Sequence, residues 1–405
     1  MYAICDALIH TCGSHGVIKK GTLLVDQGKI VDIGTNVALP DNCDILSADG
    51  YEIVPGFIDA HSHLGMQSEG LSVADGNEAS SAVNPDLLAL DGFNPFEEDV
   101  IRCVQGGVST VCLLPGSAVS YGQIVEQIGV IEGVGSVIKT AVQGCGPKVL
   151  KENAGLKMAL GDHPKRFFGQ RKEVPATRMG EIALIRAAME EGKQSDLKPR
   201  FRYMRALLSH EIPARIHVHR ARDILAALRL REEYGFDLVL DHVTEGYMVA
   251  STISEKGIDC VVGPITLTRR GPELQNISIK NAIILSEHGI CVALTCDHPT
   301  FPAWYLPYHA GMLVGKGMEY EDALKTITIN PAKILGVADK VGSLERGKDA
   351  DFVLFKGDPL EILTPIQAVF VDGQIVSGKL GHLVGPVETF GGNSVKKFGG
   401  EGKCW

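Results

Sequence analysis

The 405-residue sequence lacks an apolar run of about 18 residues, the length that a membrane-spanning helix needs. Its N-terminus has no basic segment followed by an apolar one, and so predicts no secretory signal. An excess of positive charge is also missing, because the net charge of −10 disfavours a nucleic-acid backbone as partner. The ten cysteines are scattered without a CxxC pair, which fits reduced thiols better than a disulfide framework. We therefore expect a cytoplasmic protein that acts on a small molecule, with no nucleic-acid or membrane partner.

The two ends of the chain share a strand-and-turn pattern. Residues 22–34 form two short apolar runs around a Gln-Gly turn, which predicts a β-hairpin. A similar pattern surrounds the turn at Asp372 and Gly373. We therefore expect residues 1–54 and 341–380 to form one small composite β domain, a β-sandwich, and residues 381–405 to form a Gly-rich C-terminal tail.

The middle of the chain, residues 55–340, alternates apolar runs of strand length with amphipathic stretches of helix length. This alternation is typical of a parallel sheet with crossover helices. Helices are expected over 221–234, where Gly235 would end the helix, and around 179–191. Loops rich in polar residues and glycine, 68–99 and 166–202, are expected at the active site and would carry the specificity. The predicted strands are 53–60, 108–114, 137–142, 156–160, 214–218, 238–240, 260–262 and 291–294. Eight such units predict an α/β fold with a (β/α)8 TIM-like barrel.

Two histidines, His61 and His63, follow the first of these apolar runs. Residues i and i+2 of a strand point to the same face, so an extended backbone would place both imidazoles together. Such a pair is half of a metal site, although two surface or core histidines would give the same pattern.

Similar side chains follow other predicted strands. His217 and His219 end the fifth strand, His242 follows the sixth, and Asp297 with His298 follows the eighth. Active sites of these barrels lie at the C-terminal ends of the strands. Imidazole and carboxylate are the ligands that zinc and similar divalent ions prefer, so the pattern predicts a divalent metal site at the barrel mouth.

These motifs resemble those of the metal-dependent amidohydrolase superfamily, and most closely those of its imidazolonepropionase-related members. The resemblance rests on Val54-Pro-Gly-Phe-Ile-Asp-Ala-His-Ser-His, Ile216-His-Val-His, Asp241-His and Thr295-Cys-Asp-His-Pro, and on the late segments 330–336 and 342–353. It implies hydrolysis of C–N bonds in amides, cyclic amides, amidines or aminated rings. The metal ligands that it implies are His61, His63, His217, His242 and Asp297.

Lys157 lies where two-metal members of this superfamily carry a lysine that CO₂ carboxylates and that bridges both ions. A lysine inside an apolar strand is costly unless it is paired or modified. The alternatives are a lysine that reaches solvent or a loop carboxylate, a glutamate such as Glu152 in the bridging role, or a single ion. We expect Zn²⁺ as the metal, as one or two ions.

Several neighbouring residues are candidates for contact with substrate. The superfamily motif leaves His219 free to face the substrate, and Glu245 and His298 each follow a predicted ligand closely. Arg269 and Arg270 follow the seventh strand and could bind a substrate carboxylate in a bidentate manner, although a solvated loop charge explains them equally well.

The ligand set predicts a hydrolytic mechanism. A divalent ion lowers the pKa of its bound water from about 15.7 to roughly 7. Asp297 would act as general base and then general acid, and His219 would polarise the group under attack. The alternatives are a heterocycle deaminase, a dipeptidase or N-acyl amino acid hydrolase, and a catalytically inactive scaffold. We also expect a homo-oligomer.

Overall fold

The structure is a computed structural model that describes residues 1–66, 75–78, 80–116, 129–141, 146–194, 199–269 and 271–380. The predicted C-terminal tail 381–405, Arg270, and part of the predicted loop 68–99 lie outside these residues. Within them, no helix combines the length and the apolar character that crossing a bilayer requires.

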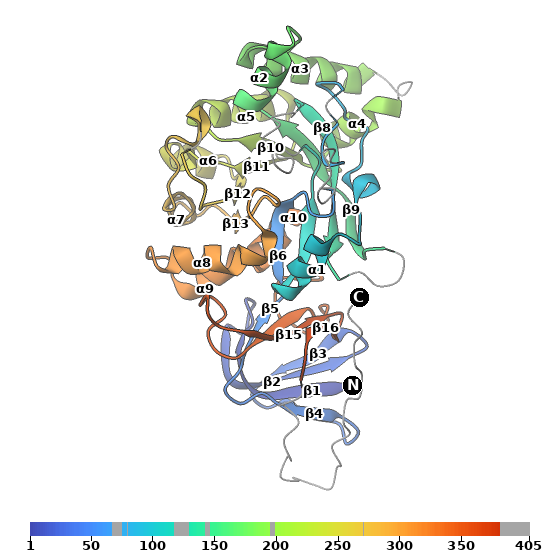
Figure 1. The fold of residues 1–405 in the computed structure, drawn as a ribbon, viewed down its shortest axis with the longest axis vertical. Coiled ribbons are helices and arrows are strands. Elements are labelled where there is room, and N and C mark those ends of the chain that lie inside the picture. Colours follow the sequence, from blue (N-terminus) through green and yellow to red (C-terminus); the bar gives the residue numbers. More distant parts are fainter. Residues whose placement is uncertain are drawn as a thin grey trace.

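The described residues form sixteen strands, which belong to two sheets (Figure 1). The strands of the first sheet are β1 (Tyr2–His10), β2 (Val17–Asp26), β3 (Lys29–Gly34), β4 (Asp44–Ser47), β5 (Glu52–Pro55), β14 (Phe352–Phe355), β15 (Ile366–Val371) and β16 (Gln374–Gly378). The strands of the second sheet are β6 (Phe57–Ser62), β7 (Val108–Leu113), β8 (Ile131–Lys139), β9 (Val149–Ala159), β10 (Ala214–Val218), β11 (Leu238–His242), β12 (Asp259–Val262) and β13 (Val292–Leu294).

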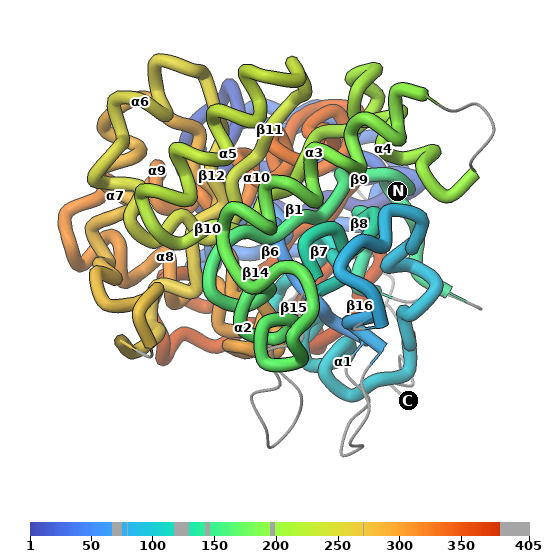
Figure 2. Tube along the Cα trace, turned by 90° about the horizontal axis from the view of Figure 1, so that it is seen from above, coloured from blue at the N-terminus to red at the C-terminus, as the bar shows by residue number. Residues whose placement is uncertain are grey.

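The helices lie almost entirely in the middle of the chain. The α-helices are α1 (Glu98–Gln105), α2 (Asp162–Gln170), α3 (Arg178–Gln194), α4 (Arg202–Leu208), α5 (Ala221–Tyr234), α6 (Ala250–Glu255), α7 (Asn281–Glu287), α8 (Leu306–Val314), α9 (Tyr320–Lys325) and α10 (Ile329–Leu335). The 3₁₀ turns are η1 (Ala89–Gly92), η2 (Pro199–Phe201), η3 (Gly246–Met248), η4 (Pro272–Leu274) and η5 (Ala303–Tyr305). Seen from above, α6, α7 and α8 lie at the periphery, outside β10 and β12 (Figure 2).

The small sheet is built from both ends of the chain, in the order β16-β15-β14-β5-β1-β2-β3, with β4 paired to β1. Both predicted turns are present: Gln27 and Gly28 join β2 to β3, Asp372 and Gly373 join β15 to β16, and all four residues have positive φ. Consecutive positive φ values are typical of type I′ hairpin turns. The strands form one sheet, so a sandwich of two sheets is not confirmed. The predicted domain boundaries remain a prediction.

The second sheet curves into a nearly closed barrel in the order β13-β12-β11-β10-β9-β8-β7-β6. The first and last strands are linked by side chains rather than by a ladder. The buried carboxylate of Asp59 on β6 accepts from the backbone N–H groups of His61 (3.2 Å) and Cys296 (3.1 Å). The hydroxyl of Thr295 donates to the carbonyl of His61 at 2.6 Å. This closure brings the end of the first barrel strand beside the residues that follow the last one.

The barrel departs from the predicted all-parallel arrangement at its third strand. β8 pairs antiparallel with both β7 and β9, whereas the other neighbouring strands of this sheet run parallel. The physical reason lies in the connection between β8 and β9, residues 140–148. It is shorter than the dozen or so residues that a parallel crossover needs, so β9 pairs antiparallel with β8. Both strands are also longer than predicted.

The predicted strand 53–60 is split in two. Gly56 separates β5, which joins the small sheet, from β6, which starts the barrel. A Cβ atom on Gly56 would lie 2.2 Å from Oγ of Ser109, so only glycine allows this close crossing. The predicted helix 221–234 is confirmed as α5, and Gly235 ends it in the left-handed conformation (φ 79°).

Candidate metal centre

The predicted histidine pair lies at the end of β6, and both side chains are buried. Nδ1 of His63 lies 2.5 Å from the carbonyl oxygen of Leu114. A carbonyl only accepts, so Nδ1 carries the proton and Nε2 is left as a ligand atom. The two rings meet edge to face, with centroids 5.2 Å apart.

Asp297 lies between these imidazoles, with its Oδ1 3.6 Å from Nε2 of His61 and 3.3 Å from Nε2 of His63. Its backbone has a φ of 52°, a conformation that costs energy in a residue other than glycine and is held by the surrounding structure. Burial alone would raise the pKa of Asp297, but its contacts with the imidazoles of His63, His242 and His61 outweigh burial and hold it below its usual range. Burial lowers the pKa of His61 to about 3. The site is therefore set for a carboxylate and neutral imidazoles, the protonation states that bind a metal.

His242 completes this group from the end of β11. Its Nδ1 lies 2.8 Å from the carbonyl oxygen of Gly263, which again fixes the proton and leaves Nε2 as a ligand atom. Three donor atoms, one each from His61, His242 and Asp297, lie within 4.8 Å of one another.

A buried carboxylate holds His61 from behind. Oδ1 of Asp241 lies 3.4 Å from Nδ1 of His61, and Asp241 also accepts from Nη2 of Arg215 at 2.6 Å. Arg215 in turn donates to the carbonyl of Ala60 at 2.8 Å. Burial would raise the pKa of Asp241, but the Arg215 charge outweighs it, so the carboxyl stays ionised. The 3.4 Å contact is electrostatic, and it places a carboxylate behind the His61 imidazole, as is common for metal-binding histidines.

The fifth strand brings two further imidazoles to the same place. The rings of His217 and His242 have centroids 4.4 Å apart, and those of His217 and His219 lie 4.6 Å apart. Nδ1 of His219 lies 2.7 Å from Oγ1 of Thr244. Burial lowers the pKa of both His217 and His219 well below the usual range.

Lys157 lies on β9 and is fully buried, as predicted for a lysine inside an apolar strand. Its Nζ is 3.5 Å from the carbonyl oxygen of Pro115, at the limit of a hydrogen bond. Burial lowers its pKa, against the charges of Asp241 and Glu132. Glu132, on β8, is also fully buried, and burial raises its pKa to about 8. The alternative bridging residue Glu152 is exposed, so that alternative is wrong.

Three predicted substrate contacts lie away from these residues. Glu245 is buried, and its two oxygens accept from the backbone N–H of Ala221 (2.8 Å) and from Nδ2 of Asn276 (2.8 Å). His298 turns toward α1, with its Nε2 3.3 Å from Oδ2 of Asp99. Arg269 is exposed on the surface. Because none of the three lines the cavity described next, their predicted contact with substrate is not supported by their positions.

A cavity of about 660 Å³ opens beside the histidines. Its lining includes His217, His219, His242 and Asp297, together with apolar side chains such as Leu267 and Leu274. The walls also carry Lys165 and Arg166 of α2, and two residues that sequence reasoning missed, His163 and Glu273. His163 could have been noticed because it follows the fourth predicted strand closely, in Gly161-Asp162-His163. Glu273 lies in a loop with no readable pattern.

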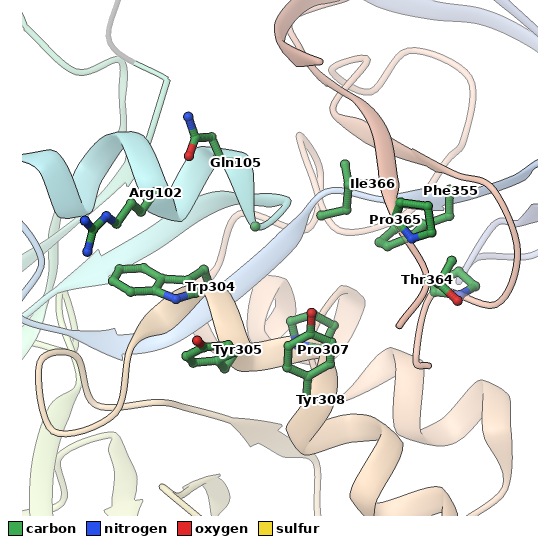
Figure 3. Close-up of a pocket in the computed structure, with 12 residues that line it drawn as sticks. Arg102, Gln105, Trp304, Tyr305, Pro307, Tyr308, Phe355, Thr364, Pro365 and Ile366 are labelled. Carbon is green, nitrogen blue, oxygen red and sulfur yellow. The ribbon is translucent and has the colours of Figure 1, made fainter. Parts of the chain in front are cut away.

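A separate cavity of about 390 Å³ lies between the barrel and the small sheet (Figure 3). Arg102, Trp304 and Tyr308 line one side of it, and Pro365 and Ile366 line the other. No member of the metal-ligand groups found among the described residues lines this second cavity.

The residues of the first cavity fit a divalent metal. Nε2 of His61 and Nε2 of His217 are buried and have no hydrogen-bond partner within the described part of the chain. Buried polar atoms without partners cost about 1–3 kcal/mol each, so their retention points to a missing partner such as a cation. The donor set of imidazoles with one carboxylate is that of zinc and similar ions.

Comparisons with known proteins agree with this chemistry. A family model described as the amidohydrolase family matches residues 280–380. The solved structure of an amidohydrolase from Thermotoga maritima is 37% identical, with a TM-score of 0.87, and the match covers 94% of this chain and all of that one.

Curated relatives point the same way. An imidazolonepropionase from Thermoplasma acidophilum is 26% identical over 364 residues, with 84% of this chain and 83% of the relative covered. The amidohydrolase tasK from Hapsidospora irregularis is 25% identical over 402 residues, and the match spans 87% of this chain but 39% of the relative. The structural match over nearly the whole chain decides the assignment: this protein belongs to the amidohydrolase family and is a hydrolase of carbon–nitrogen bonds.

Proposed function

We propose that the protein is a metal-dependent hydrolase of non-peptide C–N bonds in small amides or cyclic amides. The observation that carries the proposal is the convergence of His61, His242 and Asp297 on one point beside a cavity large enough for a small ligand. The ligands would be His61, His63, His217, His242 and Asp297, with Lys157 between them. When bound there, a divalent ion, expected to be Zn²⁺, supplies Lewis acidity and activates water at neutral pH.

Asp297 is the proposed general base and acid. Its carboxylate would take the proton of the attacking water and return it to the leaving nitrogen, which needs a group that is ionised at rest. The low pKa of Asp297 and its position beside two imidazoles support this role.

His219 is the proposed donor to the carbonyl oxygen under attack. Thr244 can donate its hydroxyl proton to Nδ1 of His219, which would leave a proton on Nε2. Its pKa lies well below the usual range, so the ring would polarise the substrate as a neutral imidazole.

Lys157 is proposed to carry a carboxyl group from CO₂. The neutral amine attacks the carbon of CO₂ and a C–N bond forms, while the electron pair of one C=O π bond moves onto oxygen. The nitrogen then loses one proton to solvent water, which gives the carbamate. A neutral amine is required, and the lowered pKa of Lys157 together with its long contact to the carbonyl of Pro115 supports this state. The carbamate would then supply two oxygens to the metal ligands.

A second candidate is the hydrolysis of N-acyl amino acids or dipeptides. Lys165 and Arg166 lie on the cavity wall, where a cation could bind a substrate carboxylate. This role was predicted for Arg269 and Arg270, but Arg269 does not line the cavity and Arg270 is outside the described residues.

A substrate panel tests the proposal, assayed with the metal-loaded protein and with protein stripped by a chelator. We expect turnover of cyclic amides that depends on the metal. Turnover of N-acyl amino acids alone would favour the second candidate, and ammonia release from aminated heterocycles without ring opening would favour a deaminase. Absence of metal from the purified protein, together with no turnover, would favour an inactive scaffold.

A further inference from the structure

A second group of metal-type side chains lies on the wall of the cavity. Donor atoms of His163, His217, His219 and Glu273 all lie within 4.8 Å of one another. His217 already belongs to the ligand set proposed above. The residues of this second group that lie outside that set are His163, His219 and Glu273.

These three residues come from different loops at the end of the barrel that faces away from the small sheet. His163 lies in the first turn of α2, His219 follows β10, and Glu273 lies in η4. Figure 1 shows α2 at this end, with the small sheet at the other. Nε2 of His163 is 3.6 Å from Oε2 of Glu273, and the rings of His163 and His217 have centroids 5.7 Å apart.

Glu273 is held in place by the backbone of the opposite loop. Its Oε1 accepts from the N–H of Asp162 at 2.7 Å, which leaves Oε2 directed at His163. A Cβ atom on Gly161 would lie 2.1 Å from Oε1 of Glu273, so glycine is needed there for the carboxylate to fit. Glu273 is 4% exposed, and a carboxylate this buried needs partners.

The imidazoles of the group have unused donor atoms. Nδ1 of His163 and Nε2 of His217 are buried without a hydrogen-bond partner in the part of the chain that the structure describes. The hydroxyl of Thr244 can also accept a hydrogen bond from Nδ1 of His219, and in that tautomer Nε2 is the atom left for a cation. Preset imidazoles and a fixed carboxylate are features of metal sites rather than of loop packing.

The charge around the group also favours a cation. The carboxylates of Asp162, Asp223 and Glu273 surround Arg178, which donates to Asp223 at 2.6 Å and to Asp162 at 3.1 Å. The Arg178 guanidinium remains 3.9 Å from Glu273. Glu273 is therefore the carboxylate that Arg178 neutralises least.

We propose that His163, His219 and Glu273 form an additional divalent-cation site on the cavity wall, separate from the ligand set of the proposed reaction. Two imidazoles and one carboxylate suit Zn²⁺ or a similar ion and leave positions open toward the cavity. An ion there would occupy His219 and part of the cavity, so it would compete with substrate. This inhibitory role rests on the proposed function, whereas the binding of the ion does not.

Zinc content after equilibrium dialysis tests the site directly. Wild type is compared with His163→Gln and Glu273→Gln, which change different loops, and with His15→Gln, which removes an exposed histidine of the small sheet. Glu273→Gln keeps an oxygen for the N–H of Asp162. We expect one bound ion fewer per chain in each cavity variant, and no change in the His15 variant. Equal zinc content in all four folded proteins would overturn the proposal.

A double variant separates this site from the proposed catalytic one. His61→Ala with His63→Ala should remove zinc from the catalytic ligand set yet keep one ion, which adding His163→Gln should then remove. If the double variant binds no zinc at all, the additional site does not exist independently and the proposal fails. This zinc count is informative even if no substrate is turned over.

Inhibition by excess zinc gives a second readout. Wild type should be inhibited at zinc concentrations at least about tenfold lower than those needed for His163→Gln, because loss of a supporting partner alone weakens metal sites about 10- to 100-fold. A change in KM in the cavity variants without any change in zinc content or zinc inhibition would mean that these residues contact substrate instead, and would contradict the proposal.

Discussion

Two fully buried lysines lie on adjacent strands of the barrel, Lys139 on β8 and Lys157 on β9, and their surroundings are opposite. Nζ of Lys139 lies 2.7–2.8 Å from carboxylate oxygens of Asp349, Asp351 and Asp372. Within the part of the chain that the structure describes, Nζ of Lys157 has one long contact, to a carbonyl 3.5 Å away.

The pKa directions follow these contacts. Burial would lower the pKa of Lys139, but its carboxylate partners outweigh burial and raise it. For Lys157, burial prevails and the pKa falls. A buried charge that is fully paired joins two parts of a fold, here the barrel and the small sheet. A buried amine without close partners lowers stability and is retained where it is needed for chemistry.

The largest effect is expected on kcat, from a change in the proposed catalytic site. Asp297→Asn should keep the fold but lower kcat by about 10²- to 10⁴-fold, because the general base is lost. The control is Asp259→Asn at the start of β12, which should leave kcat unchanged. Steady-state kinetics on the best substrate measure both, and near wild-type kcat in Asp297→Asn would remove Asp297 from the mechanism.

Lys139→Met should strongly destabilise the fold. It leaves the buried carboxylate of Asp351 without an ion-pair partner among the described residues, whereas Asp349 and Asp372 keep Lys29 and Lys148. Breaking a buried ion pair costs about 3–5 kcal/mol. Lys148→Met is the matched control, because Lys148 also lies 2.7 Å from Asp372 but its side chain is 52% exposed. That change should cost less than about 1 kcal/mol. Urea unfolding of both variants measures the difference, and equal losses would show that burial of the Lys139 cluster does not matter.

Lys157→Met should have the opposite effect on the metal-free protein. Removing a poorly paired buried amine should leave the free energy of unfolding unchanged or raise it by up to about 4 kcal/mol. Urea unfolding in buffer that contains a chelator and no CO₂ gives the comparison. A loss of stability as large as that of Lys139→Met would mean that Lys157 is a structural residue.

The small sheet holds a second fully paired charge, that of His10. Its removal is expected to change the stability of the fold less than the changes above. His10 contacts Glu321 at Nδ1 (2.7 Å) and Glu52 at Nε2 (2.9 Å). Burial would lower the pKa of His10, but the hydrogen bonds to these two carboxylates raise it to about 9. Because the folded pKa lies above the unfolded one, the stabilisation is complete below about pH 6.5 and is lost as the pH rises through about 9.

His10→Gln tests this linkage. The stability difference between wild type and variant should shrink by about 1–3 kcal/mol between pH 6.5 and pH 9.5. Thermal unfolding across this range, with His15→Gln as an exposed control, measures it. A difference that does not change with pH would mean that His10 is neutral in the folded protein.

The parts of the site that could be predicted from sequence are those fixed by local geometry. His61 and His63 follow an apolar run at a spacing of two, and His217, His242 and Asp297 follow other runs, so barrel topology alone brings them to one mouth. The two hairpin turns and the helix Ala221–Tyr234 were likewise predictable, because their signals lie within a few residues.

The parts that could not be predicted depend on contacts between distant residues. Lys139 and Lys157 both lie in apolar runs, but the partners of Lys139 are more than 200 residues away in the chain. The antiparallel direction of β8 depends on where β8 and β9 begin and end. The apolar pattern of the sequence predicted these strand limits wrongly. His163 and Glu273 come from loops whose meeting depends on Gly161 and Arg178 rather than on any periodic pattern.

The metal content of Lys157→Met tests most directly whether Lys157 belongs to a metal centre. Lys151→Met is the matched control, because Lys151 lies on the same strand but donates to the carbonyl of Leu335 at 3.0 Å. Elemental analysis should find the same number of divalent ions per chain in wild type and Lys151→Met, and at least one fewer in Lys157→Met. Equal metal content in all three proteins would contradict a role for Lys157 in binding the metal.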